Sequence, residues 1–339
     1  MRLLLPLLVA LLALVSCPAT GAKPKPAAWA RADIDLVTSH GLLGGDPASF
    51  RPDDAITRGE LSELLAGLTG AGQAPVANPT APLDLQGLDA RLVNGLGLKD
   101  TAARFAQTSR DAGLAPPPRF GTEVVARLLG LRLNHPAKDD LLERLPADPA
   151  PRSEAAYSAA QILRFGGWEL DGVRAAADEF VLPTLTDWQR RVLSTAFKRV
   201  GYPYIWGGTS DSAQSLFGVT VPGGYDCSGF VWRVYKLQAY PGARTLSSTL
   251  QGRTTFAMSA EVPKGKRIGL LELLPADVIF FGDKGPSSKP AQVGHMGIYV
   301  GNGWFVHSSG RGVALERLSG WYQARFAWGR RPLAEAGLA

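Results

Sequence analysis

The sequence predicts two folded parts: an all-α domain at residues 26–166 and an α+β domain at residues 186–335, joined by a linker at residues 167–185. Apolar residues at helical spacing run through the first part. In the second part, a helix that carries a cysteine precedes several segments rich in β-branched and aromatic residues, as expected for strands. The length of 339 residues suits two domains, and 45% apolar with 19% charged residues is an ordinary globular composition.

Residues 1–22 are predicted to be a signal peptide. Arg2 precedes an uncharged apolar run, Leu3–Val15, which is too short to span a bilayer. We therefore expect an exported protein with no transmembrane span in its mature chain. Signal-peptidase cleavage before Lys23 and lipidation of Cys17 in a lipoprotein box both fit the sequence and remain open.

The charge pattern gives no support to a nucleic-acid partner. The net charge of +6, from 36 basic and 30 acidic residues, is mild for this length and includes no block of like charges. A wholly disordered chain is also excluded, because disorder requires low hydrophobicity together with high net charge.

Residues 28–68 contain a helix–turn–helix pattern. Apolar residues from Ala30 to Val37 recur at helical spacing, and a turn-rich segment, GGDPASFRPDDA, follows. The second helix is expected to begin at a capping box, in which the Thr57 hydroxyl bonds the helix start and the Glu60 carboxylate reaches back.

Two weaker copies of this pattern follow. The segment RFGTE, residues 119–123, precedes one helix, and PRSE, residues 151–154, precedes another. A pattern that occurs three times predicts a repeat domain over residues 26–166, with degenerate second and third copies. The Pro-rich stretch Ala74–Pro82 is expected to be a spacer between the first two copies.

The cysteine content singles out Cys227, because no other cysteine remains once residues 1–22 are removed. Asp226 is placed to cap a helix, with Cys227 in its first turn. Unpaired backbone N–H groups and the positive end of the helix dipole favour a thiolate at that place, which is how nucleophilic cysteines are made. The alternative is a buried structural cysteine.

Five segments of the second part are predicted to be strands: residues 276–282, 295–301, 304–309, 312–318 and 325–333. A two-residue turn after the second strand would pair His307 with Ile298 and put His295 and His307 on opposite faces of the sheet. A three-residue loop at Gly301–Gly303 pairs His307 with Gly297 and puts both histidines on one face. We predict the three-residue loop, because both histidines then serve one site.

These residue types are those of nucleophilic acyl chemistry. Cys227 would attack a carbonyl carbon, His295 would take and return the proton, and His307 would hold the second imidazole nitrogen and fix the ring's orientation. Thiol–imidazole chemistry needs neither a metal nor an organic cofactor, so none is expected. His40 and His135 lie at turns without clustered ligands and are expected to be surface residues.

The motifs PYIWGG, YDCSGF, ADVIFF, HMGIYVGNG and FVHSS occur in the order, and nearly at the spacing, of the NlpC-type cell-wall peptidases, which residues 186–335 resemble. The resemblance implies a papain-like α+β fold and cleavage of the γ-D-glutamyl–diamino-acid bond in peptidoglycan stem peptides. It also implies that Cys227 is the nucleophile, His295 the base and His307 the third polar residue.

The same resemblance implies further site residues. Tyr204 corresponds to a tyrosine whose hydroxyl lies beside the nucleophile and helps the oxyanion site. Asp226 and Ser228 would flank the substrate-binding side, and Arg253 would meet a substrate carboxylate.

Three positions depart from that family's pattern. The loop at residues 208–226 is longer than usual, which affects the rim of the cleft. Met258 stands where relatives often have Gln. Ala276 stands where Gly is usual, and we expect this change to have no effect.

The helix–FRPDDAITRGE–helix unit resembles the S-layer homology repeat, which occurs in threes and binds secondary cell-wall polysaccharide. In that family the Arg of the T-R-x-E motif contacts the acidic glycan, which implies glycan-binding roles for Arg58 and Arg152. The alternative is that these residues only cap helices.

The sequence thus predicts an exported, cell-wall-associated peptidoglycan endopeptidase whose repeats hold the wall glycan. Two alternatives remain open: an amidase or acyltransferase that uses the same thioester, and a wall-binding protein with an idle peptidase domain. The idle protein would lack a nucleophile or a base, yet Cys227, His295 and His307 are all present.

Overall fold

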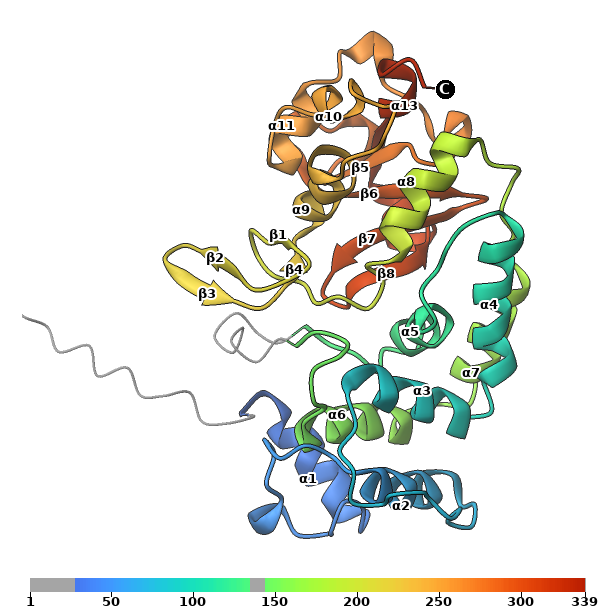
Figure 1. Ribbon diagram of the computed structural model, residues 1–339, viewed down its shortest axis with the longest axis vertical. Coiled ribbons are helices and arrows are strands. Elements are labelled where there is room, and N and C mark those ends of the chain that lie inside the picture. The colour runs from blue at the N-terminus through green and yellow to red at the C-terminus, as the bar shows by residue number, and fades with distance from the viewer. Residues whose placement is uncertain (1–27, 135–143, 339) are drawn as a thin grey trace, which may run out of the picture.

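The computed structural model describes residues 28–134 and 144–338, so the predicted signal peptide lies outside the described residues. Figure 1 shows a helical N-terminal half (residues 28–178) below a mixed C-terminal half (residues 186–338). The N-terminal helices are α1 (Arg31–Ser39), α2 (Arg58–Thr69), α3 (Leu85–Gly95), α4 (Lys99–Asp111), α5 (Phe120–Leu128), α6 (Arg152–Leu163) and α7 (Glu169–Asp178). Within the described ranges, no helix has the length and apolarity needed to cross a membrane.

Three short extended segments, each leading directly into a helix, join the N-terminal half. They precede α2, α3 and α6, and each pairs antiparallel with the next through the bridges Thr57–Pro82, Asp84–Pro149 and Pro151–Ala55. Backbone hydrogen bonds such as Ile56 N to Ala150 O (2.8 Å) complete this junction. One junction therefore joins the starts of α2, α3 and α6.

The capping box predicted at the first repeat is confirmed. Glu60 N donates to Thr57 Oγ1 (3.3 Å), and Thr57 N donates to Glu60 Oε2 (2.9 Å). The position predicted for the second repeat, residues 119–123, is wrong. The second of the three junction segments leads into α3 instead, where Asp84 caps the helix by accepting from Gly87 N (2.8 Å).

Two segments expected to lack structure take part in the fold. The expected spacer ends at Pro82, which belongs to the junction described above. The expected linker at residues 167–185 contains α7, which packs against α4 and is joined to it by an ion pair between Arg104 and Asp178. The prediction of a plain linker is therefore wrong, because α7 buries Val173 and Ala177.

The C-terminal half is an α+β fold, as predicted. Its main sheet has five antiparallel strands in the order β8-β7-β6-β5-β9. These strands are β5 (Val278–Gly282), β6 (Val293–Gly301), β7 (Trp304–Ser309), β8 (Gly312–Arg317) and β9 (Phe326–Arg330), close to the predicted bounds. Short strands β1 (Thr209–Ser210), β2 (Gln214–Leu216), β3 (Val219–Val221) and β4 (Gly224–Tyr225) form two small ribbons.

Helices cover this sheet and carry the cysteine. They are α8 (Asp187–Phe197), α9 (Cys227–Trp232), α10 (Leu246–Thr249), α11 (Thr255–Ala260), α12 (Gly320–Arg325) and α13 (Pro332–Glu335), and a π-helical turn at Arg233–Leu237 extends α9. Helix α8 begins at a capping box, in which Thr186 N donates to Gln189 Oε1 (2.8 Å) and Gln189 N donates to Thr186 Oγ1 (3.3 Å). Figure 1 shows α8 and α9 beside the sheet, with the β2–β3 ribbon projecting from the body.

The two halves share one hydrophobic core. The ring of Phe120 on α5 stacks on that of Phe197 on α8, with centroids 4.6 Å apart. Phe105 on α4 meets the buried Trp304 of β7 edge-on, at 5.9 Å. The N-terminal half therefore supports the sheet directly.

Candidate active site

Cys227 is the first residue of α9, and Asp226 caps the helix as predicted. The Asp226 carboxylate accepts from Gly229 N and from Ser228 Oγ, the latter at 2.8 Å. Gly229 is required here, because a Cβ at that position would lie 1.8 Å from the carbonyl oxygen of Gly208. The backbone of Gly208 thus packs directly against the first turn of α9.

The β6–β7 hairpin has the predicted register, in which His307 pairs with Gly297. The predicted three-residue loop is wrong, because Gly301 pairs with Trp304 and the turn contains only Asn302 and Gly303, both with positive φ. The odd residue is supplied by a bulge at Val300, which shifts the pairing before the histidines are reached. His295 and His307 consequently lie on one face of the sheet.

The two imidazoles are in direct contact. Nε2 of His295 and Nδ1 of His307 are 2.7 Å apart, which is a hydrogen bond. His307 is fully buried, and Phe281 stacks on the ring of His295 with centroids 5.6 Å apart. Both rings are therefore held by packing as well as by the hydrogen bond.

Two contacts bring the histidine strands to Cys227. The Cys227 thiol lies beside the backbone N–H of Met296, the residue after His295. Ser308, the residue after His307, donates through Oγ to the carbonyl of Tyr225 at 2.6 Å. The structure thus brings all three predicted residues of the triad into one region.

Burial keeps the Cys227 thiol protonated. Burial, followed by the negative charge of Asp226, raises the pKa of the thiol to about 12, although backbone N–H groups of Ser228 and Met296 oppose the shift. Burial and the neighbouring His307 lower the pKa of His295 to about 3. The expectation of a thiolate favoured by the helix start is therefore wrong for this state, in which thiol and imidazole are both neutral.

Sequence reasoning missed Glu316, on β8. Its Oε2 lies 3.7 Å from Nε2 of His307, on the side of that ring away from His295. Burial raises the pKa of Glu316, but the nearby His307, the charge of Arg311 and a hydrogen bond from Tyr322 bring it down to about 2. The available signal was an acidic residue directly after the apolar run GVAL of the strand GVALER.

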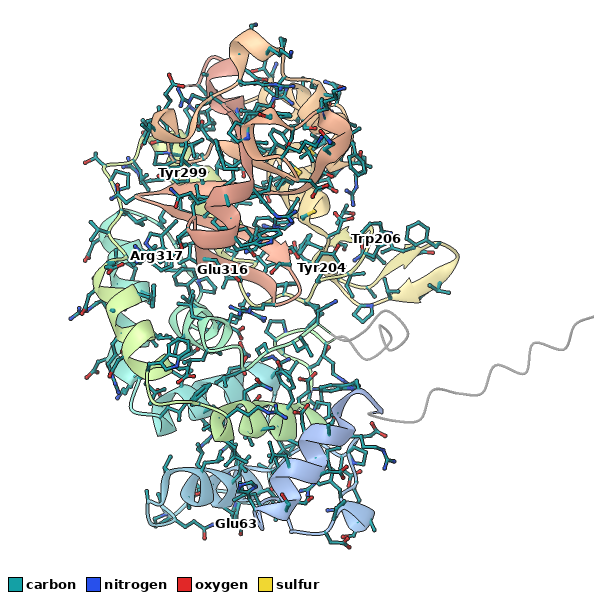
Figure 2. The ribbon with its side chains drawn as sticks, turned by 180° about the vertical axis from the view of Figure 1, so that it is seen from behind. Glu63, Tyr204, Trp206, Tyr299, Glu316 and Arg317 are labelled. Carbon is teal, nitrogen blue, oxygen red and sulfur yellow. The ribbon has the colours of Figure 1, made fainter. Side chains whose placement is uncertain are left out.

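Tyr204 lies near the predicted nucleophile. It forms a parallel bridge with Tyr225, and Tyr225 precedes Asp226 and Cys227. Figure 2 shows Tyr204 and Trp206 toward the side from which the β2–β3 ribbon projects, with Glu316 on the body of the same half. The tyrosine is half-buried, and its bridge to Tyr225 places its backbone beside the segment that leads into Cys227.

Asp226, Ser228 and Arg253 form one cluster beside Cys227. Arg253 Nη1 donates to Ser228 Oγ (2.7 Å), Nη2 lies 3.4 Å from Asp226 Oδ2, and Nη2 donates to the carbonyl of Gly207 (3.0 Å). About a third of the Arg253 side chain is exposed (33%). The structure therefore brings together all three residues predicted for the substrate-binding side.

The long loop at residues 208–226 is anchored at its base. Asp211 accepts from Arg199 (2.8 Å), from Arg233 (3.0 Å) and from the Tyr225 hydroxyl. Beyond this anchor the β2–β3 ribbon projects, with Phe217 strongly exposed at its tip. The extra length of the loop thus forms a rim near the Asp226 cluster.

The arginines predicted to bind glycan differ in their surroundings. Arg152 is buried and donates to the carbonyls of Phe50 (2.9 Å) and Leu43 (3.0 Å), and it pairs with Glu60. These contacts join the start of α6 to Leu43, Phe50 and Glu60. Arg58 begins α2 and is half-buried.

The described residues include no group of three or more His, Cys, Asp or Glu side chains able to hold a metal ion. His40 is exposed at the end of α1, with Nδ1 2.9 Å from the carbonyl of Leu36. His135 lies outside the described residues.

A helix-borne thiol beside paired histidines on an antiparallel sheet defines the class of papain-like thiol–imidazole proteins. The family model described as "NlpC/P60 family" matches residues 201–331, and the S-layer homology domain model matches residues 22–62. The chain thus carries an NlpC/P60 family domain preceded by an S-layer homology domain.

Curated relatives each match about two fifths of this chain. "Probable peptidoglycan endopeptidase LytE" of Bacillus subtilis (strain 168) is 31% identical over 134 residues, which are 39% of this chain and 30% of that protein. "Gamma-D-glutamyl-L-lysine dipeptidyl-peptidase" of the same organism is 28% identical over 128 residues, 38% of this chain and 34% of that protein. The chain therefore spans about a third of the length of these relatives.

Among solved structures, an NlpC/P60 family protein from Bacillus cereus ATCC 10987 is 25% identical, with a TM-score of 0.33, over 46% of this chain and 43% of that one. The NlpC/p60 domain of the peptidoglycan hydrolase SagA is 21% identical, with a TM-score of 0.31, over 42% of this chain and 97% of that one.

Proposed function

We propose that this protein is an exported, cell-wall-associated cysteine endopeptidase that cleaves the γ-D-glutamyl–diamino-acid bond of peptidoglycan stem peptides. The observation that carries the proposal is the hydrogen bond of 2.7 Å between His295 and His307, on strands that contact the segment bearing Cys227. The relatives named as peptidoglycan endopeptidase and γ-D-glutamyl-L-lysine dipeptidyl-peptidase support the substrate class.

The neutral thiol and imidazole favour attack with simultaneous proton transfer. Cys227 Sγ bonds to the γ-carbonyl carbon of D-Glu while its proton passes to His295. The negative oxygen that develops is met by the backbone N–H of Cys227 and by the Tyr204 hydroxyl. The carbon–nitrogen bond then breaks, and His295 returns the proton to the departing amine.

Water completes the cycle. His295 takes one proton from a water molecule, whose oxygen bonds to the thioester carbon. The carbon–sulfur bond breaks, His295 returns that proton to the Cys227 sulfur, and the D-Glu γ-carboxyl group is released and loses the second proton to solvent. An acyltransferase would pass the same thioester to an amine, and no feature of the site favours that reaction.

Substrate binding is assigned to the cluster beside Cys227. We assign Asp226 and Ser228 to the recognition of a free amine, and the part-exposed guanidinium of Arg253 to the recognition of a carboxylate. A stem peptide carries both groups, which makes the cluster suited to its N-terminal end.

Wall association is assigned to the N-terminal half. The S-layer homology match over residues 22–62 supports binding to secondary cell-wall polysaccharide, with Arg58 as the contact to acidic groups. We assign Arg152 to the repeat junction instead, because its guanidinium is buried and bonded. Export rests on the signal peptide predicted at residues 1–22, with lipidation of Cys17 as the open alternative.

The test uses residues 23–339 and the Cys227→Ala variant with defined diaminopimelate- and lysine-type stem peptides, read by mass spectrometry. We expect cleavage between D-Glu and the diamino acid by the parent only. Cleavage by the variant would contradict the assigned nucleophile. Absence of any cleavage by folded, reduced parent protein would contradict the endopeptidase and favour the amidase or transferase.

A further inference from the structure

Three side chains from adjacent strands form a line that ends near Cys227. His295 on β6 contacts His307 on β7 at 2.7 Å, and Glu316 on β8 lies 3.7 Å from the far nitrogen of His307. That nitrogen, Nε2, is buried, and no group in the part of the chain that the structure describes forms a hydrogen bond with it. Glu316 is thus the acidic group that it faces.

A histidine as the third residue creates an ambiguity. With both rings neutral, His307 can accept from His295 at Nδ1 or donate to it from Nδ1. If His307 donates, Nε2 of His295 must accept, and the proton of His295 then occupies Nδ1. Only the first arrangement leaves Nδ1 of His295 free to take the proton of a thiol.

We propose that Glu316 is a positioning residue that resolves this ambiguity by holding a proton on Nε2 of His307. With that proton in place, Nδ1 of His307 accepts from Nε2 of His295, and Nδ1 of His295 carries the lone pair that serves Cys227. An ionised carboxylate only accepts hydrogen bonds, so it favours this arrangement alone. The low pKa of Glu316, about 2, keeps the carboxylate ionised.

Glu316 is itself held from two sides. Arg311 Nη1 lies 3.8 Å from its Oε1, and the Tyr322 hydroxyl hydrogen-bonds to it. Arg311 also donates to the carbonyl of Arg127 in the N-terminal half (3.3 Å), and Arg127 donates to the carbonyl of Arg311. The position of the carboxylate therefore depends on contacts between the halves.

The first test measures the protons directly. In ¹⁵N-histidine-labelled parent protein near neutral pH, we expect NMR to find the proton of each ring on Nε2 in both His295 and His307. Protons on Nδ1 of both rings would overturn the proposal. The role of Glu316 in the reaction rests on the proposed endopeptidase function. This measurement needs no variant and no substrate, so its outcome is independent of the test of that function.

The second test is a double-mutant cycle on stem-peptide cleavage. The amide in Glu316→Gln can donate as well as accept, so it no longer favours one tautomer. We expect kcat to fall by about 10- to 100-fold with KM little changed. This loss is smaller than the loss in a serine protease whose histidine is held wholly in the wrong tautomer. In a His307→Asn background the amide oxygen accepts from His295 whatever stands at position 316. There Glu316→Gln should change kcat by less than about twofold.

The control variant is Glu261→Gln, which removes another largely buried glutamate paired with an arginine, Arg330 (2.6 Å), but facing no histidine. We expect it to keep the parental kcat within about twofold. Equal losses from Glu316→Gln in the parental and His307→Asn backgrounds would overturn the proposal and assign Glu316 a structural role.

Discussion

The Cys227 thiol experiences two opposing influences. Its place at the start of α9 offers backbone N–H groups, which favour a thiolate. Burial and the charge of Asp226 outweigh them and raise its pKa to about 12. The sequence showed the helix start but not the depth of burial, which depends on how β6 packs against α9.

This balance predicts slow alkylation of Cys227 near neutral pH. A group with a raised pKa stays protonated below it, so the rate with iodoacetamide should rise with pH through about pH 10 and beyond. The same protein unfolded in urea is the control and should react with the pH dependence of an ordinary thiol. A fast rate that does not change between about pH 5 and pH 8 would instead indicate a thiolate–imidazolium pair.

Ala276 carries backbone strain that the sequence alone did not reveal. Its φ is 69°, a left-handed conformation that costs a non-glycine residue about 1–2 kcal/mol. Glycine avoids this cost, but its greater freedom in the unfolded chain lowers the stability of the folded protein by about 0.4–1 kcal/mol. This balance favours glycine over alanine at position 276, contrary to the expectation of no effect.

We predict that Ala276→Gly raises the free energy of unfolding in urea by about 0.5–1 kcal/mol. Ala327→Gly is the matched control, because Ala327 is buried in β9 and is not among the residues with positive φ. That control should lower the free energy of unfolding. A loss of stability in Ala276→Gly would contradict the strain.

At the scale of elements, the strands and the hairpin were predictable because their patterns are local. Alternation located β5 to β9, and the need to place His295 and His307 on one face selected the register. Glu316 was missed because its approach to His307 depends on the β7–β8 register, in which Phe305 pairs with Glu316. The second repeat was misplaced because Leu85 stands where the other copies have Arg58 and Arg152.

We predict different roles for the two arginines, Arg152 in stability and Arg58 in glycan binding. Arg152→Met removes a buried guanidinium and leaves Glu60 and two carbonyls without it, so we predict a loss of about 3–5 kcal/mol in the free energy of unfolding. Arg58→Ala should change stability by less than about 1 kcal/mol and should weaken binding to purified secondary cell-wall polysaccharide.

Unfolding by urea and a polysaccharide pull-down measure the two effects. Unchanged stability in Arg152→Met would contradict the assigned junction role. Unchanged wall binding in a folded Arg58→Ala variant would contradict the glycan contact.

At the scale of the whole molecule, the shared core couples the halves. Phe120 and Phe197 stack across the boundary, and Arg127 donates to the carbonyl of Gly201 at 2.6 Å. Composition and length predicted two domains, but they could not show that the domains pack together, because such contacts join residues far apart in sequence.

We therefore predict a single calorimetric unfolding transition for residues 23–339. Phe120→Ala truncates a core side chain, which costs about 3–5 kcal/mol of stability. We expect it to lower two temperatures equally: the one at which stem-peptide cleavage is lost and the one at which the helices melt. Two separate transitions, or a variant whose cleavage survives the melting of the helices, would contradict a shared core.

The central claim is that Cys227 forms the covalent bond to the γ-D-glutamyl carbonyl. The most direct test is a peptide of L-Ala–γ-D-Glu with an electrophilic carbon in place of the scissile amide, followed by intact mass and peptide mapping. We expect one adduct, on Cys227, formed much more slowly in His295→Ala. An adduct on another residue, or no adduct on Cys227 in protein that cleaves the natural stem peptide, would contradict it.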